Sequence, residues 1–300
     1  METLREVLDP DFLLRNSVYI SLLVGLACPL VGAYLVLRRL IFLGVALPQV
    51  SSCGIAFAFA LHAWNWIPHL EEGSEHSLAF VGSTVFTLVS ILLLSFLEKR
   101  GRGTAEGRVG TAYVLAGAWS ILLLVKNPYG EHGLLDRLKG EIIAVSNTEL
   151  GWTALAFGLV VVLLLVFQKE FLLVSFDPDM ATSLKKSVVW WDSFLFLLVG
   201  LTISMAVLSV GPLVTFGFLL LPPLIAHRLA SNMRQFAFMS AAFGVLTAFA
   251  GFLIAYKWDI PVGPTDVALL GVVYAIVNLG KGLQGRFVSA QSIGSTEQGR

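Results

Sequence analysis

The stretch FLLRNSVYISLLVGLACPLVGAYLVLRR, residues 12–39, decides the fold. After Arg15 it runs without a charged residue as far as Arg38. A membrane-spanning helix needs about 20 mostly apolar residues, so this run is long enough to cross a bilayer. Two arginines directly after such a run favour a cytoplasmic exit. We therefore predict a first membrane span that ends inside the cell at Arg38 and Arg39.

Eight further apolar stretches follow the first. Hydrophobic residues make up 56% of the 300-residue chain and charged residues only 13%, as expected for a protein that lies mostly in the membrane. Backbone groups in hydrocarbon must be hydrogen-bonded internally, so runs of this length predict α-helices. The sequence therefore predicts an all-α, polytopic membrane protein with about eight to nine transmembrane helices. The nine stretches are Phe12–Leu37, Leu43–Ala63, Leu78–Leu97, Thr111–Val125, Trp152–Phe167, Trp190–Val210, Leu213–Ala226, Gln235–Tyr256 and Val267–Leu279.

The placement of the basic residues predicts the orientation. If the spans alternate from a cytoplasmic Arg38, 14 of the 20 lysines and arginines lie inside and 6 outside. This asymmetry follows the positive-inside rule and places the N-terminus outside and the C-terminus inside. The inner residues are Arg38, Arg39, Lys99, Arg100, Arg102, Arg108, Lys169, Lys185, Lys186, Arg228, Arg234, Lys281, Arg286 and Arg300, and the outer ones are Arg5, Arg15, Lys126, Arg137, Lys139 and Lys257.

The chain divides into one membrane domain and two short flanks. Residues 1–11 resemble a short helix that lies on the membrane surface, because their apolar side chains share one helical face. Residues 12–280 form the membrane domain. Residues 281–300 are rich in Gly, Ser and Gln, which predicts a flexible tail.

Small residues and prolines mark where the helices should meet or bend. Gly25, Cys28, Gly32 and Ala33 lie on one face of the first span and predict close helix contact. Pro222 and Pro223 should break or kink the seventh apolar stretch. Kinks of this kind are tolerated where neighbouring groups satisfy the freed carbonyls, and they often line a cavity.

The inner segment SFDPDMATSLKK, residues 175–186, carries the strongest local signal. Asp177 can cap a helix, Pro178 suits its first turn, and Asp179 favours the positive end of the helix dipole. Two lysines complement the other end. We predict a short cytoplasmic helix of two or three turns. The residues alone leave open whether it is a connector or a docking element.

The sequence lacks the motifs of membrane enzymes and of ATP binding. It has neither a His-Glu-x-x-His string nor a Gly-x-x-x-x-Gly-Lys-[Ser/Thr] loop. A non-enzymatic transporter or channel subunit remains, with any pumping energy supplied by another chain. A group of histidines and glutamates outside could bind Zn²⁺ weakly, although a solvated loop is the commoner meaning. That group is His62, His69, His76, Glu71, Glu72 and Glu75.

Four stretches resemble the membrane subunits of zinc/manganese-type ABC importers, in the order that the family has them. They are GLACPLVGAYLVLRRLIFLG (Gly25–Gly44), GEIIAVSNTEL (Gly140–Leu150), SFDPDMATSLK (Ser175–Lys185) and SVGPLVTFGFLLLPPLIAHRLA (Ser209–Ala230). The resemblance implies the metal-type permease fold. It also implies two ATP-binding subunits below, an extracytoplasmic substrate-binding protein and a second permease copy, as a homodimer or heterodimer.

The resemblance also implies functional residues. The inner helix would dock onto the ATPase through Ser175, Phe176, Asp177, Pro178, Asp179, Met180 and Ala181. The substrate pathway would include Val45, Gln49, Cys53, Pro222 and Pro223.

One departure concerns the second span. After the Arg-Arg exit the family usually reads Gly-Asp-Ala-x-Ser-His, and its Asp and His are taken as metal ligands. Here Val45 and Gln49 stand at those positions, and neither is a strong ligand for Mn²⁺ or Zn²⁺. Our span boundaries place no Asp or Glu in the interior of any span, and Asp192 lies close to the end of one. The metal ligands of this chain are therefore unassigned.

We expect the permease subunit of an ABC importer for zinc, manganese, iron or a metal complex, in a bacterial inner membrane. We expect no cofactor in this chain, since ATP would bind the partner subunit. We expect membrane lipid, and no nucleic acid, among its partners. Three alternatives remain: a divergent permease that pairs with a ligand-bearing one, a carrier of a different substrate, or a non-transporting membrane assembly protein.

Overall fold

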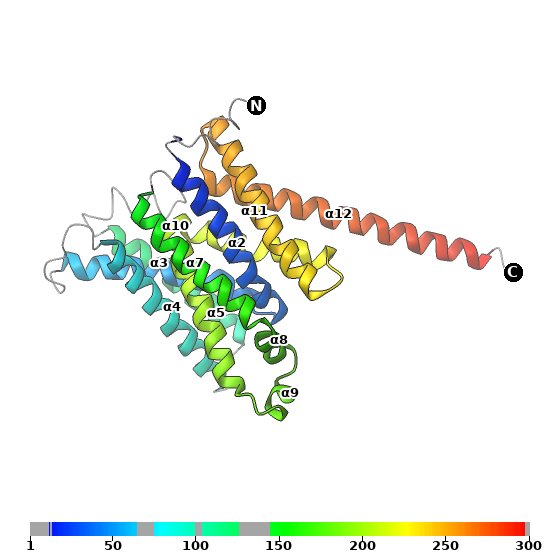
Figure 1. The fold of residues 1–300 in the computed structure, drawn as a ribbon, viewed down its shortest axis with the longest axis horizontal. Coiled ribbons are helices and arrows are strands. Elements are labelled where there is room, and N and C mark those ends of the chain that lie inside the picture. Colours follow the sequence, from blue (N-terminus) through cyan, green and yellow to red (C-terminus); the bar gives the residue numbers. More distant parts are fainter. Residues whose placement is uncertain (1–11, 13, 65–74, 100–103, 126–144, 298–300) are drawn as a thin grey trace.

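The computed structural model describes residues 12, 14–64, 75–99, 104–125 and 145–297, and every element among them is a helix (Figure 1). Eight of these helices are long and apolar enough to cross a membrane, which confirms the predicted all-α, polytopic class. The predicted surface segment 1–11 lies outside the described residues. The helices are α2 (Arg15–Leu37), α3 (Ile41–Ala63), α4 (Glu75–Lys99), α5 (Ala105–Val125), α7 (Asn147–Val166), α8 (Gln168–Phe176), α9 (Pro178–Ser183), α10 (Val188–Leu229), α11 (Met233–Trp258) and α12 (Val262–Glu297).

Helix α10 consists of two halves that meet at a kink at Gly211. Gly211 has φ 80° and ψ 167°, a backbone region that glycine favours, and Pro212 follows it. The first half begins beside the end of α2, where Asp192 pairs with Arg38 at 2.7 Å. The second half ends near the same end of α2, since Ala226 and Ala33 belong to one apolar cluster. The halves, residues 188–210 and 212–229, therefore correspond to two of the predicted spans.

Helix α2 lies at the centre of the bundle and approaches its neighbours through small residues. A Cβ added to Gly32 would lie 1.8 Å from the carbonyl oxygen of Leu219, in the second half of α10. A Cβ added to Gly25 would lie 2.7 Å from the carbonyl oxygen of Gly244, in α11. The predicted small-residue face of the first span is thus confirmed as a surface of close helix contact.

The two ends of the bundle carry different groups. At one end, the Asn16 side-chain amide donates to the Val145 carbonyl at 2.9 Å and to Asn147 Oδ1 at 2.8 Å, joining the start of α2 to the start of α7. At the other end, Arg38 meets α8 and the start of α10. The residues that we predicted to be cytoplasmic in these helices thus share one end of the bundle, called the inner end below.

Helix α12 begins at the outer end and continues as a helix to Glu297. Its last part extends away from the bundle, as Figure 1 shows. The helix thus runs past residue 280, where we predicted that the membrane domain ends. The division into a domain and a flexible tail stays a prediction.

Candidate functional site

A capped helix-turn-helix element protrudes at the inner end of the bundle. Helix α8 ends at Phe176 and α9 begins at Pro178, with Asp177 between them. The Asp177 carboxylate accepts the backbone N–H of Met180 at 2.8 Å, as the sequence predicted for an N-cap. Helix α9 spans six residues, fewer than the two or three turns predicted.

The far end of α9 is closed by its own backbone. Lys185 has φ 57°, and the N–H of Lys186 donates to the Ala181 carbonyl at 3.0 Å. The N–H of Lys185 donates to the Thr182 carbonyl at 2.9 Å, which completes a Schellman motif. Both ends of α9 are therefore fixed, so the helix is stable at this short length.

Arg38 holds this element against the bundle. Its Nε donates to Ser175 Oγ at 2.8 Å, and its Nη1 pairs with Asp192 at 2.7 Å. The Arg38 side chain is only 11% exposed, so water screens these contacts little. From the sequence we assigned Arg38 to topology alone. Its partners lie 137 and 154 residues away, so no local pattern shows the contact.

A second contact joins α8 to the start of α10. Lys186 Nζ donates to Glu170 Oε1 at 2.9 Å and lies 5.8 Å from the Trp191 ring centre. The hydrogen bond from Lys186 lowers the pKa of Glu170, because it stabilises the ionised carboxylate. The element is thus tied to the bundle on both sides of α9.

Three large apolar side chains are exposed on the element, among polar ones. Phe176, Met180 and Leu184 are 59%, 52% and 55% exposed. Met180 and Leu184 lie one turn apart along α9, and Phe176 ends α8 just before it. Ala181, in the same short helix, is fully buried. We call Phe176, Met180 and Leu184 the apolar strip. Exposed apolar strips of this kind are typical of surfaces that bind another protein.

The predicted pathway residues of the second span face neighbouring helices. Val45 and Gln49 are half-buried, and Gln49 Nε2 lies 3.4 Å from the position that a Cβ on Gly117 of α5 would take. Cys53 is buried in a cluster with Ala116 of α5. Gln49 and Cys53 thus lie on the α5 side of α3. Their role in a pathway stays a prediction.

The two prolines of the predicted pathway lie in another part of the bundle. Pro222 and Pro223 are buried in the second half of α10, which continues past them as far as Leu229. The inner end of this half packs on Ala33 of α2. The prolines therefore belong to the packing around α2, whereas Gln49 and Cys53 face α5.

A group of buried hydroxyls lies between α3, α4 and α10, which the sequence did not indicate. Ser51 Oγ lies 2.5 Å from Ser83 Oγ, and Thr87 Oγ1 donates to the Ser83 carbonyl at 2.8 Å. Ser204 Oγ lies 3.5 Å from Thr87 Oγ1. All four side chains are buried, so these helices share a polar contact inside the apolar bundle.

Asp266 corrects our prediction that no acidic residue lies within a span. The prediction was wrong because α12 begins at Val262, before the apolar run that we used to place the span. The Asp266 side chain is fully buried, and neither carboxylate oxygen has a hydrogen-bond partner among the described residues. A Cβ on Gly251 of α11 would lie 1.9 Å from Asp266 Oδ1, so only a glycine leaves room there.

The described residues hold no group of three or more His, Cys, Asp or Glu side chains that could bind a metal ion. The predicted outer cluster of histidines and glutamates falls mostly on residues outside those described. The described part of the chain thus has exposed apolar side chains at its inner end, and in α12 a buried carboxylate that stands apart from other such ligands.

The fold is that of a helical, multi-pass membrane protein. Over residues 11–281 the sequence matches the family model described as the ABC 3 transport family. The chain therefore belongs to this family, which confirms the resemblance read from the four stretches.

Two manganese transport proteins are similar to this chain over most of its length. The chain is 30% identical over 271 residues to the manganese transport system membrane protein MntD of Bacillus subtilis, covering 85% of this chain and 88% of the relative. It is 25% identical over 264 residues to the manganese transport system membrane protein MntC of Halalkalibacterium halodurans, covering 88% and 85%. These relatives place the chain among metal-type ABC permeases.

A solved structure shares the fold. A chain of PsaBC from Streptococcus pneumoniae, determined in complex with a Fab, superposes with a TM-score of 0.78 at 23% identity. The match covers 92% of this chain and 94% of that chain. At this identity the likeness concerns the arrangement of the helices, and it agrees with the predicted metal-type permease fold.

Proposed function

We propose that this chain is the membrane-spanning permease of an ABC importer for a divalent metal ion, with Mn²⁺ as the first candidate. A separate ATP-binding subunit would dock on α8 and α9 and drive transport. An extracytoplasmic binding protein would deliver the ion, and a second permease copy would complete the pathway in a bacterial inner membrane.

The apolar strip is the observation that carries this proposal. Phe176, Met180 and Leu184 are more than half exposed on an element that Arg38 and Lys186 join to the bundle. Exposing apolar area is unfavourable by about 25 cal/mol per Å², so such a strip favours a partner that covers it. Arg38 joins the same element to α2 and α10, so a displacement of α9 by a bound subunit would be transmitted to these helices.

Charged substitutions in the strip test the docking step. Phe176→Asp together with Met180→Asp should prevent co-purification of the ATP-binding subunit, or abolish substrate-stimulated ATPase activity, because a carboxylate would be desolvated in the interface. Thr182→Asp is the matched control, since Thr182 is exposed on the same short helix but lies off the strip. A folded double variant that keeps its partner and its full stimulated activity would refute the docking role.

Manganese is the first candidate because two relatives of this chain are named as manganese transport proteins. The second span offers only Val45 and Gln49 where the family usually has Asp and His. A bare divalent ion entering there would lose water without gaining a carboxylate. We infer that a partner permease supplies the ligands, or that the cargo arrives as a chelate or is a different substrate.

Uptake into vesicles separates these possibilities. The homodimer with its ATPase and binding protein should carry Mn²⁺, Zn²⁺ and Fe²⁺ poorly, and Val45→Asp with Gln49→His should increase Mn²⁺ or Zn²⁺ uptake. Robust uptake by the unmodified homodimer, without gain in the double variant, would refute the missing-ligand inference. It would leave the importer function intact.

A further inference from the structure

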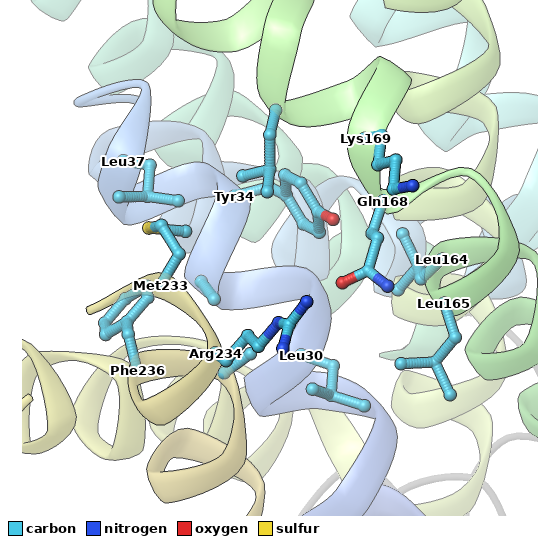
Figure 2. Close-up of a pocket in the computed structure, with 13 residues that line it drawn as sticks. Leu30, Tyr34, Leu37, Leu164, Leu165, Gln168, Lys169, Met233, Arg234 and Phe236 are labelled. Atoms are coloured by element: carbon cyan, nitrogen blue, oxygen red, sulfur yellow. The ribbon is translucent and has the colours of Figure 1, made fainter.

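A cavity of about 250 Å³ opens at the inner end of the bundle, between α2, the α7–α8 junction and α11 (Figure 2). Its interior is apolar, with leucines from α2 and α7 and Phe236 from α11. Its rim is polar. Figure 2 shows the guanidinium of Arg234 pointing into the cavity from α11, with Gln168 and Lys169 on the facing wall.

The rim carries two basic side chains, Lys169 and Arg234. Among the described residues, neither Lys169 nor Arg234 forms an ion pair. The carboxylate next in sequence, Glu170, is hydrogen-bonded by Lys186 at 2.9 Å, and the charge of Lys169 has a smaller effect on the pKa of Glu170. The rim therefore carries two positive charges on opposite walls of one cavity. Such an arrangement suits a group that carries negative charge and several acceptor oxygens.

The apolar part of the cavity borders the lipid-facing side of the bundle. Leu165 lines the cavity and is 54% exposed, and Leu155, Leu159 and Val162 on the same helix are also more than half exposed. Leu30 lines the cavity from α2 and is half-buried. The cavity thus combines an apolar wall at the hydrocarbon with a cationic rim at the inner boundary of the membrane, as expected of a site for an amphiphile.

We propose that this cavity binds an anionic phospholipid of the inner leaflet, with its phosphate between Lys169 and Arg234 and an acyl chain along the leucines of α2 and α7. A water-soluble anion would use only the rim, and a zwitterionic lipid would bring its own cation to a cationic rim. The two basic residues stand at the starts of α8 and α11. The bound lipid therefore connects these helices, in addition to the contacts made by Arg38. The inference requires no transport activity and stands apart from the proposed function.

Lipid titration of the purified full chain in detergent tests this site. Native mass spectrometry would follow binding of phosphatidylglycerol, of phosphatidylcholine with the same acyl chains, and of the water-soluble glycerophosphoglycerol. We expect phosphatidylglycerol to bind at least about tenfold more tightly than either of the others, because only it offers both parts of the ligand.

Two kinds of variant separate the charges from the cavity. Lys169→Gln with Arg234→Gln should weaken phosphatidylglycerol binding by about 30-fold, since each basic residue near an anionic surface contributes about a factor of five. Ala237→Phe keeps both charges but fills the cavity, and it should weaken binding as well. Arg228→Gln is the control, because Arg228 is exposed at the same end and does not line the cavity.

Three results would overturn the proposal. Equal binding of phosphatidylglycerol and phosphatidylcholine would show a nonspecific annular lipid. Equally strong binding of glycerophosphoglycerol would show a site for free anions. Unchanged binding in a folded Lys169→Gln, Arg234→Gln variant would place the lipid elsewhere, and the circular dichroism spectrum of that variant checks its fold.

Discussion

Gly32→Ala should destabilise the bundle markedly, although it adds one methyl group. The new Cβ would lie 1.8 Å from the carbonyl oxygen of Leu219 and 2.7 Å from its carbonyl carbon. A carbon and a carbonyl oxygen normally approach to about 3.3 Å, so the two helices must separate by about 1.5 Å. The obstacle is backbone in the second half of α10, which cannot rotate away as a side chain could.

The size of the effect follows from this geometry. Overpacking a tight interior typically destabilises by about 1–3 kcal/mol, and a clash with rigid backbone belongs at the upper end of that range. At about 2–4 °C per kcal/mol for larger domains, the melting temperature should fall by about 5–10 °C. Gly158→Ala is the matched control, because a Cβ on Gly158 of α7 meets nothing within 4 Å. Its effect should be neutral or slightly stabilising, since alanine favours helix by up to about 1 kcal/mol.

The assay is thermal unfolding of the two variants and the parent chain, side by side in one detergent, followed by the emission of the native tryptophans. If unfolding is irreversible, the fraction of protein that stays folded after heating at one fixed temperature ranks the three proteins in the same order. A Gly32→Ala melting temperature equal to that of Gly158→Ala would refute the reasoning. It would mean that α2 and α10 are not in close backbone contact in the folded protein.

Three other predictions concern charge and topology. The hydrogen bond from Lys186 lowers the pKa of Glu170, so the stability that this carboxylate contributes is present above the unfolded pKa of about 4.3 and is lost as the pH falls through the lower folded value. The melting temperature should therefore drop more steeply from about pH 5 to pH 3 in the parent chain than in Glu170→Gln. Parallel curves would contradict this. Asp266→Asn should leave the melting temperature unchanged or raise it, because a neutral amide replaces a buried carboxylate that has no hydrogen-bond partner among the described residues. A large fall in the melting temperature would instead indicate a bound cation or another partner of Asp266. In intact cells an impermeant thiol reagent should label the variant Asp259→Cys, at the exposed outer end of α11, but not Ser183→Cys in α9. The two native cysteines are buried and should not react. The reverse labelling pattern would mean that the topology is inverted.

The sequence alone determined the features that depend on local composition. Long apolar runs must form helices in hydrocarbon, so the number of spans and their approximate positions followed from hydropathy. The small residues of the first span predicted close contact, which Gly25 and Gly32 make. The cap at Asp177 also formed as predicted, because an N-cap involves residues only three positions apart.

The tertiary structure decided every feature that depends on residues far apart in the chain. Arg38 joins Ser175 and Asp192 across 137 and 154 positions. Lys169 and Arg234 line one cavity only because α8 and α11 both contact α2. Asp266 became a buried group because α12 starts earlier than its apolar run. Hydropathy reports how much of a helix prefers hydrocarbon, but not which of its sides meets protein and which meets lipid. That choice is made by packing between helices, so the partners of each polar side chain emerge only from the folded bundle.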